Sequence, residues 1–164
     1  MARTTRLSLS GAAFAVIAVL STAGFAAAPG VPGTPARHGK ETFKIVATTP
    51  GPMHAPVTAT GAFKATGYFW RKRASLVFPH GRIAVRRHLT STTVNPPDLS
   101  TCVFTAKQTG TFDVWYATGW YKGLRYNGDY TTYITGHLKK TGHDQCGSTI
   151  VSYRAVTYEV GVIP

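Results

Sequence analysis

From residue 41 to residue 164, apolar and polar residues alternate with a period of two, and β-branched and aromatic residues are frequent. This pattern is typical of half-buried β-strands, because successive side chains of a strand point to opposite faces of the sheet. Apolar residues at helical spacing do not extend beyond one or two turns. We therefore expect about eight strands, over residues 41–48, 57–70, 73–78, 82–92, 101–108, 111–117, 126–138 and 148–162.

Turn-forming residues separate these segments. Residues 79–81 (Pro-His-Gly) suit a hairpin loop, and Pro96 with Pro97 removes two consecutive backbone donors, so no ladder continues there. Gly61 and Gly67 suggest bulges or barrel corners within the long segment 57–70. The sequence thus predicts an all-β fold, either an antiparallel barrel of about eight strands or a β-sandwich, since both use the same alternation.

Strand parity predicts which side chains point inward, because the more apolar set of each strand belongs to the core. The residues expected inside are Phe112, Val114, Tyr116, Tyr130, Thr132, Ile134, Val156, Tyr158 and Val160. Asp113, Asp129 and Glu159 are then expected outside. An inverted register of one strand would instead bring Asp113 and Asp129 together beside Tyr133, as a candidate carboxylate pair for acid-base chemistry.

Arg87 is unusual by the same parity, because it shares a face with Ile83, Val85 and Leu89. A guanidinium inside a barrel needs a carboxylate, a row of carbonyls or an anionic ligand, since an unpaired buried charge costs several kcal/mol. A bulge near Arg86, or a side chain that reaches the barrel rim, would avoid this cost. We favour this second interpretation and keep Arg87 as a candidate ligand-binding residue.

Residues 1–28 have the order of an export signal, with Arg3 and Arg6 before an apolar run over residues 12–20 and small residues up to Ala28. The apolar run is shorter than the ~20 residues of a spanning helix, so we expect cleavage after Ala28, a secreted protein and no transmembrane segment afterwards. Residues 29–40 are rich in Pro and Gly and suggest a flexible leader. Residues 41–164 are expected to form a single domain.

Cys102 and Cys146 are the two cysteines of the chain, and both lie in the portion expected to be exported. Because thiols pair in oxidising compartments, we predict a disulfide, which the chain-entropy model values at about 4 kcal/mol. A metal or redox site is the alternative, but the chain has no Cys-x-x-Cys motif and His143 stands alone near Cys146. No metal or cofactor is expected.

Charge is strongly unbalanced, with 18 Lys and Arg against six acids and a formal net charge of +12. Such a chain attracts polyanions, and an anionic polymer of the cell envelope is a candidate partner. Alternatively, the positive charge belongs to an ordinary solvated surface that keeps a secreted protein soluble. No specific nucleic-acid motif is present. The candidate polyanion-binding residues are Arg71, Lys72, Arg73, Arg82, Arg86, Lys139 and Lys140.

Aromatic residues gather around one expected turn. Their rings suit stacking on a small apolar ligand, or the packing of one barrel end and of glycines on neighbouring strands. Together with Arg87, the candidate ligand-binding residues are Trp115, Tyr116, Trp120, Tyr121 and Tyr133. Neither a Gly-x-Ser-x-Gly elbow nor a Gly-rich phosphate loop occurs, so catalysis has little support.

The order of segments 76–85, 101–105, 108–112 and 119–128 resembles a group of small secreted bacterial proteins of unknown function. Their glycine and aromatic pattern is similar to that of allene-oxide-cyclase-like and dirigent-like barrels. The resemblance covers residues 74–133 and implies an eight-stranded antiparallel barrel with a central cavity, in relatives that cyclise or guide reactive apolar intermediates. Residues 115–118 and 125–127 depart from the pattern, and no catalytic residue is carried over.

We therefore predict a secreted, basic, disulfide-linked barrel that binds a small apolar ligand or associates with the cell envelope without catalysis. A cyclase-like or dirigent-like enzyme and an electrostatic binder of extracellular polyanions are the alternatives.

Overall fold

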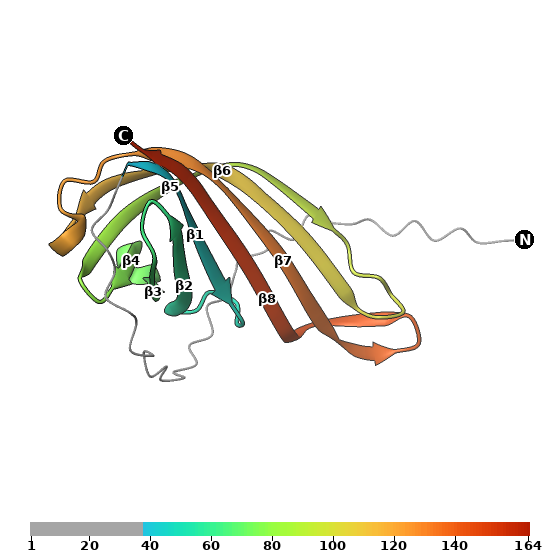
Figure 1. Cartoon of the computed structure of the whole chain (residues 1–164). Helices are drawn as coiled ribbons and strands as arrows, with labels where there is room; N and C mark the ends of the chain where they lie inside the picture. The colour runs from blue at the N-terminus through green and yellow to red at the C-terminus, as the bar shows by residue number, and fades with distance from the viewer. Residues whose placement is uncertain (1–37) are drawn as a thin grey trace, which may run out of the picture.

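The computed structural model describes residues 38–164, so the predicted export signal and most of the predicted leader lie outside the described residues. Eight antiparallel strands, hydrogen-bonded in sequence order, close into a barrel because β1 pairs with both β2 and β8 (Figure 1). The all-β barrel is thereby confirmed, and the sandwich alternative is wrong. The strands are β1 (Gly39–Ala47), β2 (His54–Gly61), β3 (Ala65–Trp70), β4 (Ser75–Phe78), β5 (Gly81–Asn95), β6 (Val103–Ala117), β7 (Asn127–Gly142) and β8 (Gln145–Ile163).

Two of the expected strand boundaries are wrong, although the number of strands is right. The segment 57–70 is two strands, β2 and β3, because Gly61 has a φ of +125°, a conformation that glycine adopts readily and other residues rarely do. Conversely, the segments 101–108 and 111–117 form one strand, β6, which runs straight through Gly110. The two short 3-10 helices are η1 (Arg71–Arg73) and η2 (Gly119–Tyr121).

Aromatic rings cover glycines on neighbouring strands. At five strand glycines, a Cβ atom would lie less than 3 Å from a ring atom of such a partner, so each pair needs glycine at that position to admit the ring. Close approach of this kind lets a sheet bend sharply, as a small barrel requires. The pairs are Gly67 with Phe78, Gly110 with Tyr130, Gly128 with Phe112, Gly136 with Phe104, and Gly161 with Tyr126.

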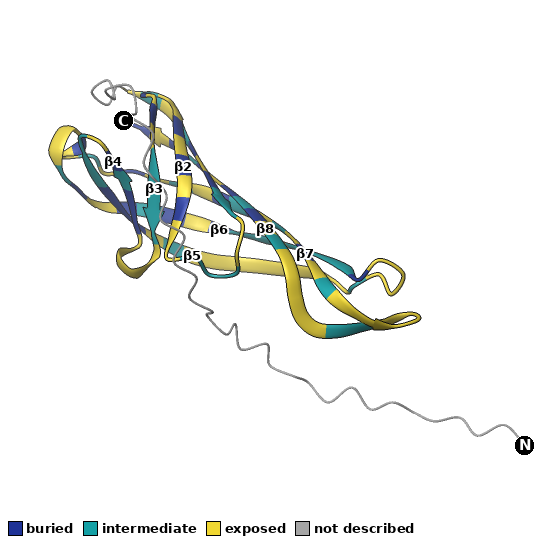
Figure 2. Ribbon diagram, turned by 90° about the horizontal axis from the view of Figure 1, so that it is seen from below, coloured by how far each residue is buried: buried dark blue, intermediate teal, exposed yellow. Residues whose placement is uncertain are grey.

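Buried residues concentrate in the barrel (Figure 2). The parity predicted for β6 and β7 is confirmed for Phe112, Val114, Tyr130 and Thr132, which are all buried. The parity predicted for β8 is wrong. Thr157 and Glu159 of that strand point inward, whereas Val156, Tyr158 and Val160 are partly or largely exposed.

The strands β5 to β8 continue past the ends of β1 and β4 as a long sheet that leaves the barrel (Figure 1). We call this extension, residues 88–95, 103–109, 135–142 and 145–154, the arm. Most of its residues are exposed or half-buried (Figure 2). The predicted disulfide between Cys102 and Cys146 is confirmed, and it joins the loop before β6 to the beginning of β8 at the far end of the arm.

Candidate functional site

One end of the barrel is filled by aromatic rings. The ring of Tyr121, carried by η2, packs against Phe63 and Phe78 with centroid separations of 5.0 and 5.6 Å, and Tyr121 is fully buried. Burial of its phenol group raises the pKa of Tyr121. Tyr121, a candidate ligand-binding residue by sequence, therefore belongs to the packed core.

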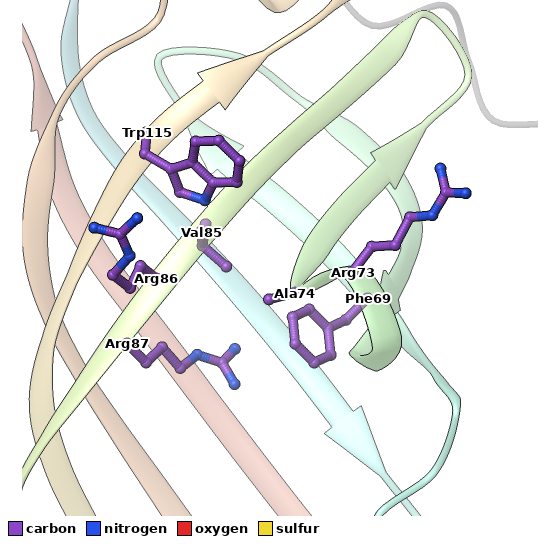
Figure 3. A pocket seen from close by; sticks show the side chains of 7 residues that line it. All are labelled: Phe69, Arg73, Ala74, Val85, Arg86, Arg87 and Trp115. Atoms are coloured by element: carbon purple, nitrogen blue, oxygen red, sulfur yellow. The ribbon is translucent and has the colours of Figure 1, made fainter.

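A pocket of about 360 Å³ lies at the opposite end, beside η1. It forms because β4 begins only at Ser75, while β5 continues beyond Val85 without a strand on that side. The single link there is the backbone N–H of Val85, which donates to the carbonyl of Ala74 over 2.9 Å. Seven residues line the pocket (Figure 3): Phe69, Arg73, Ala74, Val85, Arg86, Arg87 and Trp115.

Arg87 points into this pocket toward Phe69 (Figure 3). Its Nε donates to Oε1 of Glu159 over 2.5 Å, and its guanidinium lies 4.6 Å from the ring centroid of Phe69 and 5.7 Å from that of Tyr130. The side chain is 28% exposed, and its second terminal nitrogen, Nη2, is buried without a hydrogen-bond partner. Arg87 is thus on the inner face and paired with a carboxylate, while its partly exposed end reaches the pocket, as expected of a side chain that reaches the rim. The register shift nearby lies between Ala84 and Val85.

Glu159 is fully buried, contrary to the outward position expected from sequence. The apolar residues of β8 lie on its outer face, and the inner face uses polar pairs instead: Glu159 with Arg87, and the hydroxyl of Thr157 with that of Thr132 at 2.7 Å. Apolarity was therefore the wrong guide to this strand. The signal in the sequence was the inward parity of Arg87, for which a buried carboxylate was one of the expected partners.

Glu41 is a second buried carboxylate, and sequence reasoning missed it although it alternates with Phe43 and Ile45 on β1. Its Oε2 accepts from the backbone N–H of Phe63 over 3.0 Å, while Oε1 has no hydrogen-bond partner. Burial raises the pKa of Glu41 to about 7, against the opposing effect of the backbone donors. Burial, together with the negative charge of Glu41, also raises the pKa of Tyr126.

A β-bulge places two consecutive aromatic side chains on the outer surface. Val114 pairs with Val85 and Tyr116 pairs with Ala84, so Trp115 is the extra residue of β6. Val114 and Ala117 are buried, whereas Trp115 and Tyr116 are 49% and 42% exposed. Parity alone predicted Tyr116 inside, which is wrong because parity cannot anticipate the extra residue.

The other candidate residues fall in separate places. Trp120 is exposed on η2, and Tyr133 is exposed on the outside of β7 with the ammonium of Lys107 5.9 Å from its ring centroid. Lys139 and Lys140 lie at the far end of the arm, where Lys140 pairs in register with Cys146. The seven basic candidates therefore do not form one patch.

Three of the basic candidates are close to the end of the barrel that holds the pocket, which we call the barrel mouth. Arg73 and Arg86 line the same pocket, and Arg71 donates to the carbonyl of Gly51 over 3.2 Å. Asp113 and Asp129 face the outside, with Asp113 3.2 Å from the imidazole of His88. Among residues 38–164, no cluster of three His, Cys, Asp or Glu side chains suits a metal ion.

Comparison of the chain with models of protein families, with curated proteins and with solved structures finds no match. The resemblance to allene-oxide-cyclase-like and dirigent-like barrels and the secreted location therefore stay predictions. Within residues 38–164, no helix has the length and apolarity needed to cross a membrane.

Proposed function

We propose that this protein binds a small ligand with an apolar body and an anionic group in the pocket at the barrel mouth, without catalysing a reaction. The observation that carries this proposal is the guanidinium of Arg87, which lines the pocket, is 28% exposed there, and is held by the hydrogen bond from its Nε to Glu159. A guanidinium fixed by a carboxylate and by ring contacts is preorganised for an anion, because little side-chain entropy remains to be lost on binding.

The other lining residues supply the apolar surface. Phe69, Ala74, Val85 and Trp115 contribute rings and aliphatic groups, and a volume of about 360 Å³ falls in the range of small-molecule sites. Arg73 and Arg86 add positive charge, and the seven lining residues include no acid. The pocket thus combines a flat apolar wall with an electropositive rim, which favours an aromatic or alicyclic anion over a neutral molecule.

Calorimetric titration with naphthoate and with its uncharged analogue naphthalenemethanol tests this function. We expect both to bind, and naphthoate to bind about tenfold more tightly, because a charge-assisted hydrogen bond contributes ~1.5–3 kcal/mol. Val85→Phe should abolish binding of both by filling the pocket, and Trp115→Ser should weaken both by removing one wall. Trp120→Phe, at the filled end of the barrel, is the matched control and should leave both affinities unchanged.

The role of Arg87 needs a variant that leaves no orphaned charge. The double substitution Arg87→Met with Glu159→Gln keeps the interior neutral and should equalise the affinities for the two probes. Arg125→Met removes one exposed positive charge elsewhere and should preserve the preference. Failure of both probes to bind the native protein at millimolar concentration would refute the proposed function.

A cyclase-like or dirigent-like activity, which the sequence resemblance implies, is the weaker proposal. The barrel does hold acids suited to proton transfer, but Glu41 and Glu159 are both fully buried. A substrate would have to displace packed side chains to reach either carboxylate.

A further inference from the structure

Three aromatic side chains of residues 115–120 each lie against a basic side chain from residues 80–86. The imidazole of His80 stacks on Trp120 with a centroid separation of 3.8 Å and an interplanar angle of 12°. The guanidinium of Arg82 lies 5.8 Å from the ring centroid of Tyr116, and that of Arg86 lies 5.9 Å from that of Trp115. We call these six residues the basic-aromatic strip.

The backbone makes the strip continuous. The N–H of Trp120 donates to the carbonyl of His80, and the N–H of Thr118 donates to the carbonyl of Arg82. Tyr116 pairs in register with Ala84, and the rings of Trp115 and Tyr116 are 5.9 Å apart. Six residues of extended chain separate His80 from Arg86, so the strip is roughly 20 Å long.

The three rings of the strip are open to solvent, whereas Nε2 of His80 and Nε of Arg82 are buried, and the charge of the strip is little compensated. Trp115, Tyr116 and Trp120 are each more than 40% exposed. Of the six acids of the chain, Glu41 and Glu159 are inside the barrel, which leaves the outer surface more positive than the composition indicates. Asp113, which pairs in register with Arg86, is the acid at the arm end of the strip. Its carboxylate lies within hydrogen-bond distance of the imidazole of His88.

We propose that the basic-aromatic strip binds single-stranded nucleic acid. Basic side chains that alternate with exposed flat rings match a polymer in which every repeat carries one negative charge and one planar ring. Exposed bases stack on tryptophan and tyrosine with little sequence preference, and arginine supplies both the phosphate contact and a cation–π contact. Duplex DNA fits less well, because its bases are stacked on one another and cannot reach the rings.

Fluorescence anisotropy of a labelled oligothymidylate tests the proposal. The native protein should bind it more tightly than it binds duplex DNA or polyphosphate, which has charge but no rings, and the affinity should fall steeply with salt. Tyr116→Ser and Trp120→Ser should each weaken oligothymidylate binding about tenfold while changing polyphosphate binding little. Arg82→Gln should weaken binding to both polymers and lower the slope of the salt dependence by about one.

Tyr133→Ser is the matched control, because Tyr133 is an equally exposed tyrosine beside Lys107 that lies outside the strip. It should leave oligothymidylate binding unchanged. Tyr116→Leu keeps the apolar bulk of the side chain and removes its flat ring, so it tests stacking if the serine variant is unstable. Equal binding of oligothymidylate and polyphosphate, or native affinity in the Tyr116 and Trp120 variants, would overturn the proposal.

Tyr116, Trp120 and Arg82 do not line the barrel-mouth pocket. Their substitution should therefore leave naphthoate binding intact, and the two proposals succeed or fail separately.

Discussion

Two carboxylates lie inside the barrel, and the protein holds them in different ways. Glu159 is neutralised by Arg87 across the barrel. Glu41 has no cation partner among the described residues, and its stabilising contacts are backbone N–H groups such as that of Phe63. An unpaired buried carboxylate is costly when charged, and for that reason the pKa of Glu41 is raised to about 7.

Glu41 should therefore make the protein less stable as pH rises. In the unfolded chain Glu41 loses its proton near its ordinary pKa of 4.5, whereas the folded protein keeps it up to about pH 7. The favourable contribution is complete below pH 4.5 and is lost as pH rises through 7, with a size on the order of 3 kcal/mol at ~1.4 kcal/mol per pKa unit.

Urea unfolding at about pH 5 and about pH 8 measures this effect. Glu41→Gln removes the titrating group, and we expect its free energy of unfolding to change much less between the two pH values than that of the native protein. Asp129→Asn, at an exposed position, should keep the native pH dependence. A Glu41→Gln variant with the full native pH dependence would contradict the assignment.

Residue patterns predicted part of the interior correctly. The parity of β5 indicated the inward position of Arg87, but Glu159 was expected outside because Val156, Tyr158 and Val160 made the opposite face of β8 look like the core. In physical terms, the barrel stabilises a polar inner face by pairing Arg87 with Glu159 across its width and Thr132 with Thr157 on adjacent strands. Alternation within one strand does not contain that long-range information.

At the level of elements, glycines decide where strands bend and where they end. Residues 109–111 (Thr-Gly-Thr) read as a turn, yet Gly110 continues β6 because a ring from the next strand, that of Tyr130, covers it. Gly61 was expected to be a bulge or a barrel corner within one strand, and it ends β2, with a positive φ. The sequence does not distinguish the roles of the two glycines, because the residues that lie closest to each of them belong to another strand.

Gly110 and Gly136 provide a test of these close approaches. A Cβ at Gly110 would lie 2.1 Å from the carbonyl oxygen of His88, so Gly110→Ala forces the backbone to move. The three atoms nearest to a Cβ at Gly136 all belong to the ring of Phe104. We expect both substitutions to lower the free energy of unfolding by ~1–3 kcal/mol, as overpacking does.

Only the second clash can be relieved by shortening a side chain. In a double-mutant cycle measured by denaturant unfolding, Phe104→Ala should recover most of the loss caused by Gly136→Ala. The same Phe104→Ala should leave the loss caused by Gly110→Ala unchanged. Additive effects for the Gly136 and Phe104 pair would show that the ring does not depend on the glycine.

On the scale of the whole molecule, the packed core and the disulfide lie at opposite ends. The core cluster belongs to the barrel, whereas the bond between Cys102 and Cys146 is at the far end of the arm. The sequence predicted the bond but not its distance from the core. The alternation within a strand does not indicate where β5 to β8 extend beyond β1 and β4.

The disulfide should therefore stabilise the arm more than the barrel. Replacing Cys102 and Cys146 together by serine should raise amide hydrogen exchange over residues 88–109 and 135–153, and change little over β1 to β4. The loss in global stability should stay below the ~4 kcal/mol of the chain-entropy model, because the arm can open without the barrel. Uniformly faster exchange across all eight strands would show that arm and barrel unfold as one unit.

Closure of the barrel brings Gly39, where β1 begins, beside Ile163, where β8 ends. Both lie at the aromatic-filled end, away from the arm and from the barrel-mouth pocket (Figure 1). A protein captured on a sensor chip through a peptide tag after Pro164 would accordingly present its pocket to the flowing solution, so immobilised material is suited to screening ligand libraries.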